Sequence, residues 1–316
     1  MASVTQQLDV VRGRWAALPG NVRGGIFILI STFFFSIMLA LIKLAGERLH
    51  VTQILFFRQV VMLLLALPVI VQDAPGAIRS ARPGLQFTRV GCAFCAMLLG
   101  FTAFINLPLA DATTLSFAKT FFMTVLAIIF LGEVVGIRRW AAVAVGFLGV
   151  MIVAWPTGEG GFNIYTIMAI ASAAFVAIVM ILIRKLSQVD RPVTILTFQA
   201  VGVGILMLAP MIYFWKTPTF DEVVMLVAIG VVSAIGQTLN IFGMRAGEAS
   251  AVAPLDYTRL LFAVIFGFFV FGDWPDVRVF AGAALIVGAA IYTLQRERKL
   301  GKEARAKAKI ETAAIR

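Results

Sequence analysis

Residues 115–133 read LSFAKTFFMTVLAIIFLGE, and residues 255–273 read LDYTRLLFAVIFGFFVFGD. The two stretches align without a gap at a shift of 140 positions. Lys119 then meets Arg259, and a closing Gly–Glu pair meets a closing Gly–Asp pair. A basic residue at the same depth of an apolar run, followed at the same distance by a small–acidic pair, is hard to obtain by chance. The two stretches therefore predict an internal repeat.

Both stretches belong to a chain whose composition requires a lipid environment. Of its 316 residues, 61% are hydrophobic and 14% are charged, and its mean hydropathy is +0.97. A soluble globular domain is about 45–50% apolar and about 25% charged. A chain so poor in charge could not form a soluble surface, so we expect an all-α integral membrane protein.

Runs of about twenty apolar residues, enough to cross a bilayer as a helix, recur between short polar breaks. Five spans fall in each half, and because five is odd, the second half must lie upside down relative to the first. Inverted repeats around a binding site near the midplane are a transporter architecture. The ten predicted spans are 24–43, 52–70, 85–105, 112–131, 139–155, 162–183, 194–214, 222–243, 251–271 and 278–294.

Positive charge gives the expected orientation. Ten spans place 20 of the 27 Lys and Arg residues on one side and 4 on the other. The basic side is expected to be the cytoplasm of a bacterium, with both termini there. The expected organisation is a cytoplasmic segment at 1–23, a first repeat at 24–156, a second repeat at 157–295, and a basic tail at 296–316 beside the anionic lipids of the inner leaflet.

The chain resembles the ten-span bacterial proteins with two EamA-type domains in the drug/metabolite transporter superfamily. The resemblance covers about residues 24–295. It implies a basket of helices around a central cavity, and export of amino acids or related metabolites across the plasma membrane, although the superfamily also includes uptake proteins. The residues that carry it are FFR at 56–58, LGE at 131–133, FGD at 271–273, and small-residue turns at 110–112 and 247–250.

Ionisable residues inside spans mark the candidate substrate site. A charged residue at the centre of a membrane helix costs about 2.5–3.5 kcal/mol on insertion scales, so such residues usually face a cavity or a partner. The inverted repeat places Lys119 and Arg259 at equivalent depths near the midplane. Two cations there would repel each other unless an anion lay between them, so we predict that they bind a carboxylate or phosphate of the substrate.

The alternative for Arg259 is a local pair with Asp256, three residues earlier on the same helix face. Ser116 occupies the matching position before Lys119, so Lys119 is expected to lack such a partner. Asp256 is the only acid well inside a span. Its two interpretations are a carrier of a coupling proton and a structural partner of Arg259, of which we favour the second.

Neutral and peripheral residues complete the candidate site. Tyr257, beside the basic pair, would stack on a substrate. Asn106 and Gln237 are polar groups in apolar runs that would line the cavity or join helices by hydrogen bonds, as would Gln199. Arg58, near the outer end of the second span, is expected to extend to the interface.

Other function classes fit less well. A membrane-embedded enzyme acting on a lipid or amphipathic substrate is the main alternative. One histidine, His50, argues against a multi-histidine metal site, and one acid inside the spans argues against paired catalytic carboxylates. No phosphate-binding loop is present, no cofactor is implied, and the scattered Lys and Arg residues do not suggest nucleic acid. Cys92 and Cys95 are expected to be packing residues.

Small residues predict close packing of the fifth and tenth spans. Ala142 and Gly146, and likewise Ala284 and Gly288, are four positions apart. This spacing brings helices together either within one chain or between the protomers of a homodimer.

Overall fold

The computed structural model describes residues 20–72, 79–119, 121–123, 125–126, 137–155, 163–186, 189–190, 192–246, 253–289 and 291–292. All regular elements within these ranges are helical, as the composition predicts. They are α2 (Gly20–Ala45), α3 (Val51–Gln72), α5 (Pro83–Asn106), α6 (Leu109–Ser116), α8 (Ile137–Ala154), α9 (Ile164–Leu186), α10 (Pro192–Tyr213), α11 (Phe220–Ala246), η1 (Ala253–Tyr257) and α13 (Thr258–Phe271). A further apolar helix covers Val277–Ala289.

Six helices in the described ranges are long and apolar enough to cross a membrane. They are the predicted first, second, third, sixth, seventh and eighth spans. Two shorter apolar helices, at Ala144–Val153 and Val277–Ala289, fall on the predicted fifth and tenth spans. The total of ten spans and the inverted repeat stay predictions. The acidic exit at 131–133 and the basic tail at 296–316 lie outside the described residues.

The fourth and ninth predicted spans are each interrupted by a departure from regular α-helix. Helix α6 ends at Ser116, and Phe117 and Ala118 form a turn before helix resumes at Lys119. In the second half, a 3₁₀ segment ends at Tyr257 before α13 begins. The Ser116 hydroxyl donates to the carbonyl of Thr113, and that of Thr258 to the carbonyl of Leu255. Such hydroxyl–carbonyl bonds compete with regular helix bonding.

The end of α13 follows from the Phe-Gly-Asp sequence. Gly272 adopts a left-handed conformation, with φ of 68°. It thereby lets its own N–H donate to Phe268 and the N–H of Asp273 donate to Gly267. This glycine cap satisfies carbonyls that the last helical turn would otherwise leave without a donor.

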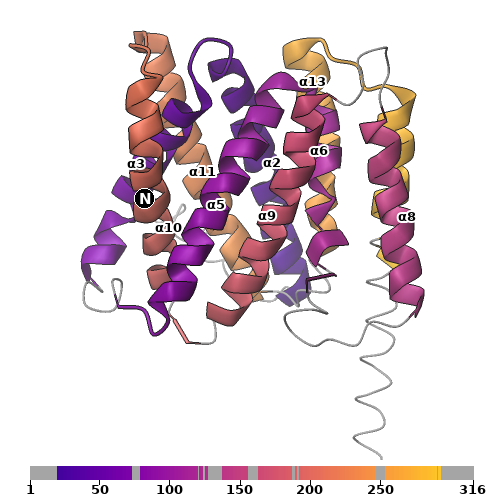
Figure 1. Ribbon diagram of the computed structural model, residues 1–316, viewed down its shortest axis with the longest axis horizontal. Helices are drawn as coiled ribbons and strands as arrows, with labels where there is room; N and C mark the ends of the chain where they lie inside the picture. The colour runs from indigo at the N-terminus through magenta and orange to yellow at the C-terminus, as the bar shows by residue number, and fades with distance from the viewer. Residues whose placement is uncertain are drawn as a thin grey trace, which may run out of the picture.

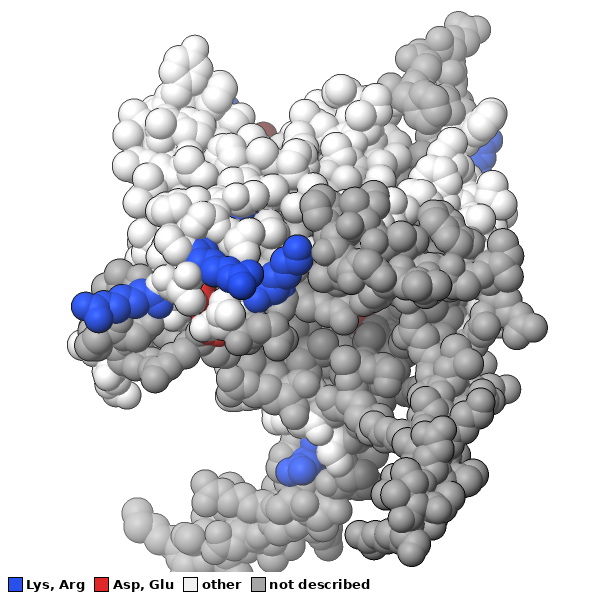
Figure 2. Space-filling view, turned by 60° about the horizontal axis from the view of Figure 1, so that its bottom comes forward, with Lys and Arg blue, Asp and Glu red and all other residues white. Residues whose placement is uncertain are grey.

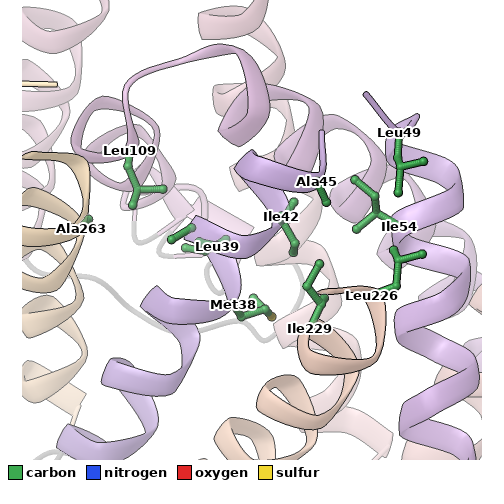
Figure 3. Close-up of a cluster of buried hydrophobic side chains, with 11 residues drawn as sticks. Met38, Leu39, Ile42, Ala45, Leu49, Ile54, Leu109, Leu226, Ile229 and Ala263 are labelled. Atoms are coloured by element: carbon green, nitrogen blue, oxygen red, sulfur yellow. The ribbon is translucent and has the colours of Figure 1, made fainter. Parts of the chain in front are cut away.

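Helices of the two halves pack against each other throughout the bundle. Helix α2 packs along α11, α5 along α9, and α3 along α10 (Figure 1). One apolar cluster lies where α2, α3 and α11 meet, and Leu109 and Ala263 extend it to α6 and α13 (Figure 3). Its buried members include Met38, Leu39, Ile42, Ala45, Leu49, Ile54, Leu226 and Ile229. The core is therefore shared between the halves.

Helix α8 and the helix at Val277–Ala289 lie side by side at one edge of the bundle (Figure 1). A β-carbon on Gly282 would stand 2.5 Å from the carbonyl oxygen of Gly149, and one on Gly149 would stand 2.6 Å from that of Gly282. The predicted packing of the fifth and tenth spans is thus present within one chain. Gly146 faces Ala289, but Gly288 meets nothing within 4 Å. A homodimer stays a prediction.

Replacing Gly282 by Val should therefore destabilise the protein strongly, because the added side chain would strike the backbone of Gly149. Gly288→Val, on the same helix with open space around it, is the matched control and should melt close to the parent protein. Thermal unfolding in detergent micelles measures both. Equal melting temperatures for the two variants would contradict the close contact.

Candidate functional site

Three ionisable side chains meet where the fourth and ninth spans are interrupted. The ammonium nitrogen of Lys119 lies 3.3 Å from Oδ2 of Asp256. A guanidinium nitrogen of Arg259 lies 2.6 Å from Oδ1 of the same carboxylate. The three residues, which we call the ion triad, are partly buried, with about a fifth to a quarter of each side chain exposed.

Local backbone geometry brings the triad together. Asp256 lies in the 3₁₀ segment η1, and Arg259 in the first turn of α13. In a 3₁₀ helix, residues three positions apart are eclipsed, which favours placing Asp256 directly beneath Arg259. Lys119 follows the turn at Phe117, and the Phe117 ring lies 4.8 Å from that of Tyr257 between centroids. Phe117 and Tyr257 are equivalents at the shift of 140, so the two interruptions touch.

The predicted local pair of Asp256 and Arg259 is confirmed. The expectation that Lys119 lacks a partner holds only along its own helix, because the carboxylate of Asp256 reaches it from the other half. The anion between the two cations is therefore a protein side chain. With one carboxylate and two cations, the triad keeps a net charge of +1.

Aromatic rings flank both cations of the triad. The Lys119 ammonium lies 5.8 Å from the centroid of Phe117, and the Arg259 guanidinium lies 5.4 Å from that of Phe35. Contacts at this range are weakly attractive. Nε of Arg259 is buried and has no hydrogen-bond partner among the described residues. Burying such a donor without an acceptor costs free energy. The triad therefore has one positive charge without a balancing acid and one N–H donor without an acceptor among the described residues.

The remaining predicted site residues differ in their relation to the triad. Ser116 is adjacent in sequence but bonds within α6, and Tyr257 contacts Phe117. Asn106 is exposed at the end of α5 and donates to the carbonyl of Thr102. Gln237 is half-buried on α11. Within the described ranges, no hydrogen bond links Asn106 or Gln237 to the triad.

Arg58 lies inside the bundle, and the expectation that it extends to the interface is wrong. Only 6% of the residue is exposed. Its Nε donates to the hydroxyl of Ser233 on α11 at 3.0 Å, and Nη1 donates to Oε1 of Gln59 at 3.2 Å. Helix α11 packs so closely on α3 that Gly230 faces Val61. Acceptors are therefore available inside the bundle, so Arg58 need not reach the interface.

Arg89 is one of the 20 Lys and Arg residues that the sequence assigns to the expected cytoplasmic side, but it is fully buried. It donates to the carbonyl of Ile195 at 2.6 Å, to Oε1 of Gln199 at 2.8 Å and to Oε1 of Gln86 at 3.3 Å. It thus joins α5 of the first half to α10 of the second. Gln199 acts here as a helix-joining residue, one of the two roles predicted for it.

Gln86 connects this arginine to an acid in the loop between α9 and α10. Its amide donates to Asp190 at 2.9 Å, which also accepts from the Ser80 hydroxyl and from the N–H of Ala81. Burial alone would raise the pKa of Asp190, but these hydrogen bonds outweigh it and hold that pKa below its ordinary value. Asp190 therefore stays ionised near neutral pH.

The opposite end of the bundle carries its own ion pairs. Lys43 donates to Asp273 at 2.8 Å and to the carbonyl of Leu107 at 3.1 Å, and Arg48 pairs with Glu222. The sequence offers Arg278 as a nearby partner for Asp273, but Arg278 lies 3.7 Å from Asp276. Both Lys43 and Arg48 reach across to the second half.

The face at the bottom of Figure 1, where α3 ends and α5 begins, carries a group of Lys and Arg side chains with little acidic surface beside them (Figure 2). This group lies on the side that the charge count predicts to be cytoplasmic. The orientation of the termini stays a prediction.

Comparison with known proteins adds the family. The model of the EamA-like transporter family matches the chain twice, at residues 22–155 and 163–295. An S-adenosylmethionine uptake transporter of Rickettsia prowazekii is 27% identical over 90% of this chain and 96% of its own. A pseudopaline exporter of Pseudomonas aeruginosa is 30% identical over 87% and 97%, and a riboflavin transporter of Brucella anthropi is 28% identical over 80% and 92%.

A solved crystal structure superimposes on this chain with a TM-score of 0.62. It is 17% identical and covers 86% of this chain and 98% of its own. At that identity, the similarity concerns the fold alone.

Proposed function

The chain belongs to the EamA-like transporter family, and from this premise we propose that it exports a small organic metabolite with an anionic group across the bacterial plasma membrane. The family and the named relatives make the chain a membrane transporter and not an enzyme. The substrate, the direction and the alternating-access mechanism are the parts that we propose.

The observation that carries the proposal is the ion triad with its net charge of +1. A positive charge inside a membrane protein is costly unless an anion compensates it. The unpartnered Nε of Arg259 offers one further donor beside that charge. A carboxylate of the substrate would supply both the missing charge and the missing acceptor. Ionised partners also give the stronger hydrogen bonds.

Unequal contacts within the triad suggest how the substrate acts on the two halves. Asp256 holds Arg259 at 2.6 Å within one segment, but it holds Lys119 at 3.3 Å across the halves. The longer contact is the one that an incoming carboxylate would replace. Lys119 would then transfer from Asp256 to the substrate, and one link between the halves would be released. In a transporter with inverted repeats, movement of one half against the other alternates between an inward-open and an outward-open state.

The direction of transport is proposed from the family resemblance. The relatives include an uptake transporter and an exporter, so their names do not decide it. Export is favoured by the resemblance of the sequence to EamA-type exporters.

Transport by the purified protein in liposomes tests the function. Liposomes filled with a mixed metabolite pool receive a pH gradient, and mass spectrometry identifies the solutes that leave. A parallel sample with the pool outside tests uptake. We expect acidic solutes to cross the membrane. Lys216→Gln is the control variant, because Lys216 is exposed between α10 and α11, and it should transport like the parent. Movement of only neutral or cationic solutes would discard the anion site, and no movement in either arrangement would contradict the proposal.

A further inference from the structure

Charges deep inside the bundle do not balance. The described residues place four cations well within the predicted spans, Arg58, Arg89, Lys119 and Arg259, against one acid, Asp256. A charge removed from water is tolerated when a partner compensates it and is costly otherwise. The ion triad accounts for three of these residues and leaves one positive charge. The two other arginines need separate accounts.

Arg89 is connected to the carboxylate of Asp190 through one intermediate side chain, that of Gln86. The Gln86 side chain accepts from Arg89 through its oxygen and donates to Asp190 through its nitrogen. The amide therefore links the arginine to the carboxylate of Asp190, which also accepts hydrogen bonds from the Ser80 hydroxyl and the Ala81 N–H. This arginine belongs to a closed structural network.

Arg58 has no such compensation. Its partners are the neutral Ser233 and Gln59, and the Met97 sulfur at 3.9 Å. No carboxylate of the described residues lies within ion-pair distance of it, and its Nη2 donates to none of them. With 6% of the residue exposed, Arg58 is a nearly buried full charge with a free donor.

An aromatic path connects Arg58 with the ion triad. The guanidinium lies 5.7 Å from the centroid of Phe101, whose ring lies 6.4 Å from that of Phe104. Phe104 in turn packs against the cluster that contains Phe117 and Ala118, directly before Lys119. Both Phe101 and Phe104 are only half-buried. Two positive charges without a balancing acid among the described residues therefore lie at the two ends of a series of aromatic contacts.

We propose that Arg58 is a second anion-binding residue, and that the substrate carries two anionic groups joined by an apolar body. One group would pair with Lys119 of the triad, and the other with Nη2 of Arg58, while the body lies against Phe101 and Phe104. This inference rests on the proposed function and narrows its substrate class to organic dianions.

The surroundings of Arg58 favour a soluble substrate over a lipid headgroup as the source of the second anion. Arg58 lies seven residues after the start of α3, which is about 10 Å along the helix. Its contacts come from α3, α5 and α11, so it points between helices. A phospholipid headgroup would have to leave the interface to reach it.

Binding of matched mono- and dianions tests the inference. The probes are α,ω-dicarboxylates of increasing chain length and aromatic dicarboxylates, each paired with its mono-amide, which keeps the body and removes one charge. Thermal stabilisation of the purified full chain gives the apparent Kd of each. We expect at least one dicarboxylate to bind 10-fold or more tightly than its mono-amide.

Variants then assign the preference to Arg58. Arg58→Gln should bind the dicarboxylate no better than the mono-amide, whereas Arg58→Lys should keep part of the preference and Lys119→Gln should weaken both probes. Lys216→Gln is the surface control. If Arg58→Gln does not fold, two measurements still test the second site. They are the parent's preference for the dicarboxylate over its mono-amide, and the reduction of that preference in Arg58→Lys.

Three results would overturn the second site. They are equal binding of each dicarboxylate and its mono-amide by the parent, an unchanged preference in Arg58→Gln, and a phospholipid that co-purifies with the parent and is lost from Arg58→Gln. Binding of monoanions alone would leave the proposed function standing. If no anion binds or is transported, both the second anion site and the proposed function are rejected.

Discussion

Lys119→Gln should strongly reduce transport of the anionic solute while the protein still inserts and folds. Lys119 is the triad cation held by the longer contact, across the two halves. A neutral amide can donate a hydrogen bond but cannot compensate a carboxylate, and bonds to charged groups contribute about 1.5–3 kcal/mol. An effect of this size on the bound solute corresponds to a loss of roughly 10- to 150-fold in the initial rate.

The fold should survive this change because Asp256 keeps Arg259 at 2.6 Å. Size-exclusion profile and melting temperature in detergent check folding, and the initial rate in liposomes checks transport. Lys119→Arg keeps the charge and should retain part of the rate. The double change Lys119→Gln with Arg259→Gln, which removes both cations, should be inactive. Transport at the parent rate by the double variant would rule out the anion site.

Asp256→Asn should produce the largest loss of stability among the site variants. The change leaves Lys119 and Arg259 near each other without the carboxylate that now separates them. Removing one partner of a buried ion pair costs about 3–5 kcal/mol, and the partial exposure of the triad places the expected loss near the lower end, at about 3 kcal/mol. Thermal unfolding in micelles measures it.

The same variant separates the two interpretations of Asp256. Its free cations should bind a simple monocarboxylate such as acetate more tightly than the parent does, so acetate should restore more stability to the variant. If Asp256 carries a coupling proton, residual transport will no longer respond to a pH gradient. A retained response assigns it to the structural pair, which we favour. Parent-like stability without acetate would contradict the arrangement of the triad.

Much of the triad could be predicted from the sequence because it depends on local spacing. Asp256 and Arg259 are three residues apart, which places them on one helix face. The contact between Lys119 and Asp256 spans 137 positions. It depends on how the halves pack, and neither apolar runs nor spacing encode that. The shift of 140 indicated equivalent depth for Lys119 and Arg259, but not that one acid serves both.

The two misjudged arginines illustrate the same limit. The positions of Arg58 and Arg89 along their spans suggest the interface, yet both find acceptors that the second half brings to them, Ser233 for the first and Gln199 for the second. Depth along a helix can be predicted from sequence, whereas the face toward which a side chain points depends on distant partners. The interruption after Ser116 was missed for another reason, because that stretch contains no Gly or Pro and its hydroxyl groups are a weaker indication.

A structure of the protein with its anionic solute bound tests the central claim most directly. The solute is the one that the liposome assay identifies, and the quantity to measure is the distance between its carboxylate and Nζ of Lys119. The account predicts hydrogen-bond distance there, with the contact between Lys119 and Asp256 released and that between Asp256 and Arg259 kept. A solute bound elsewhere, with the ion triad unchanged from its present geometry, would contradict it.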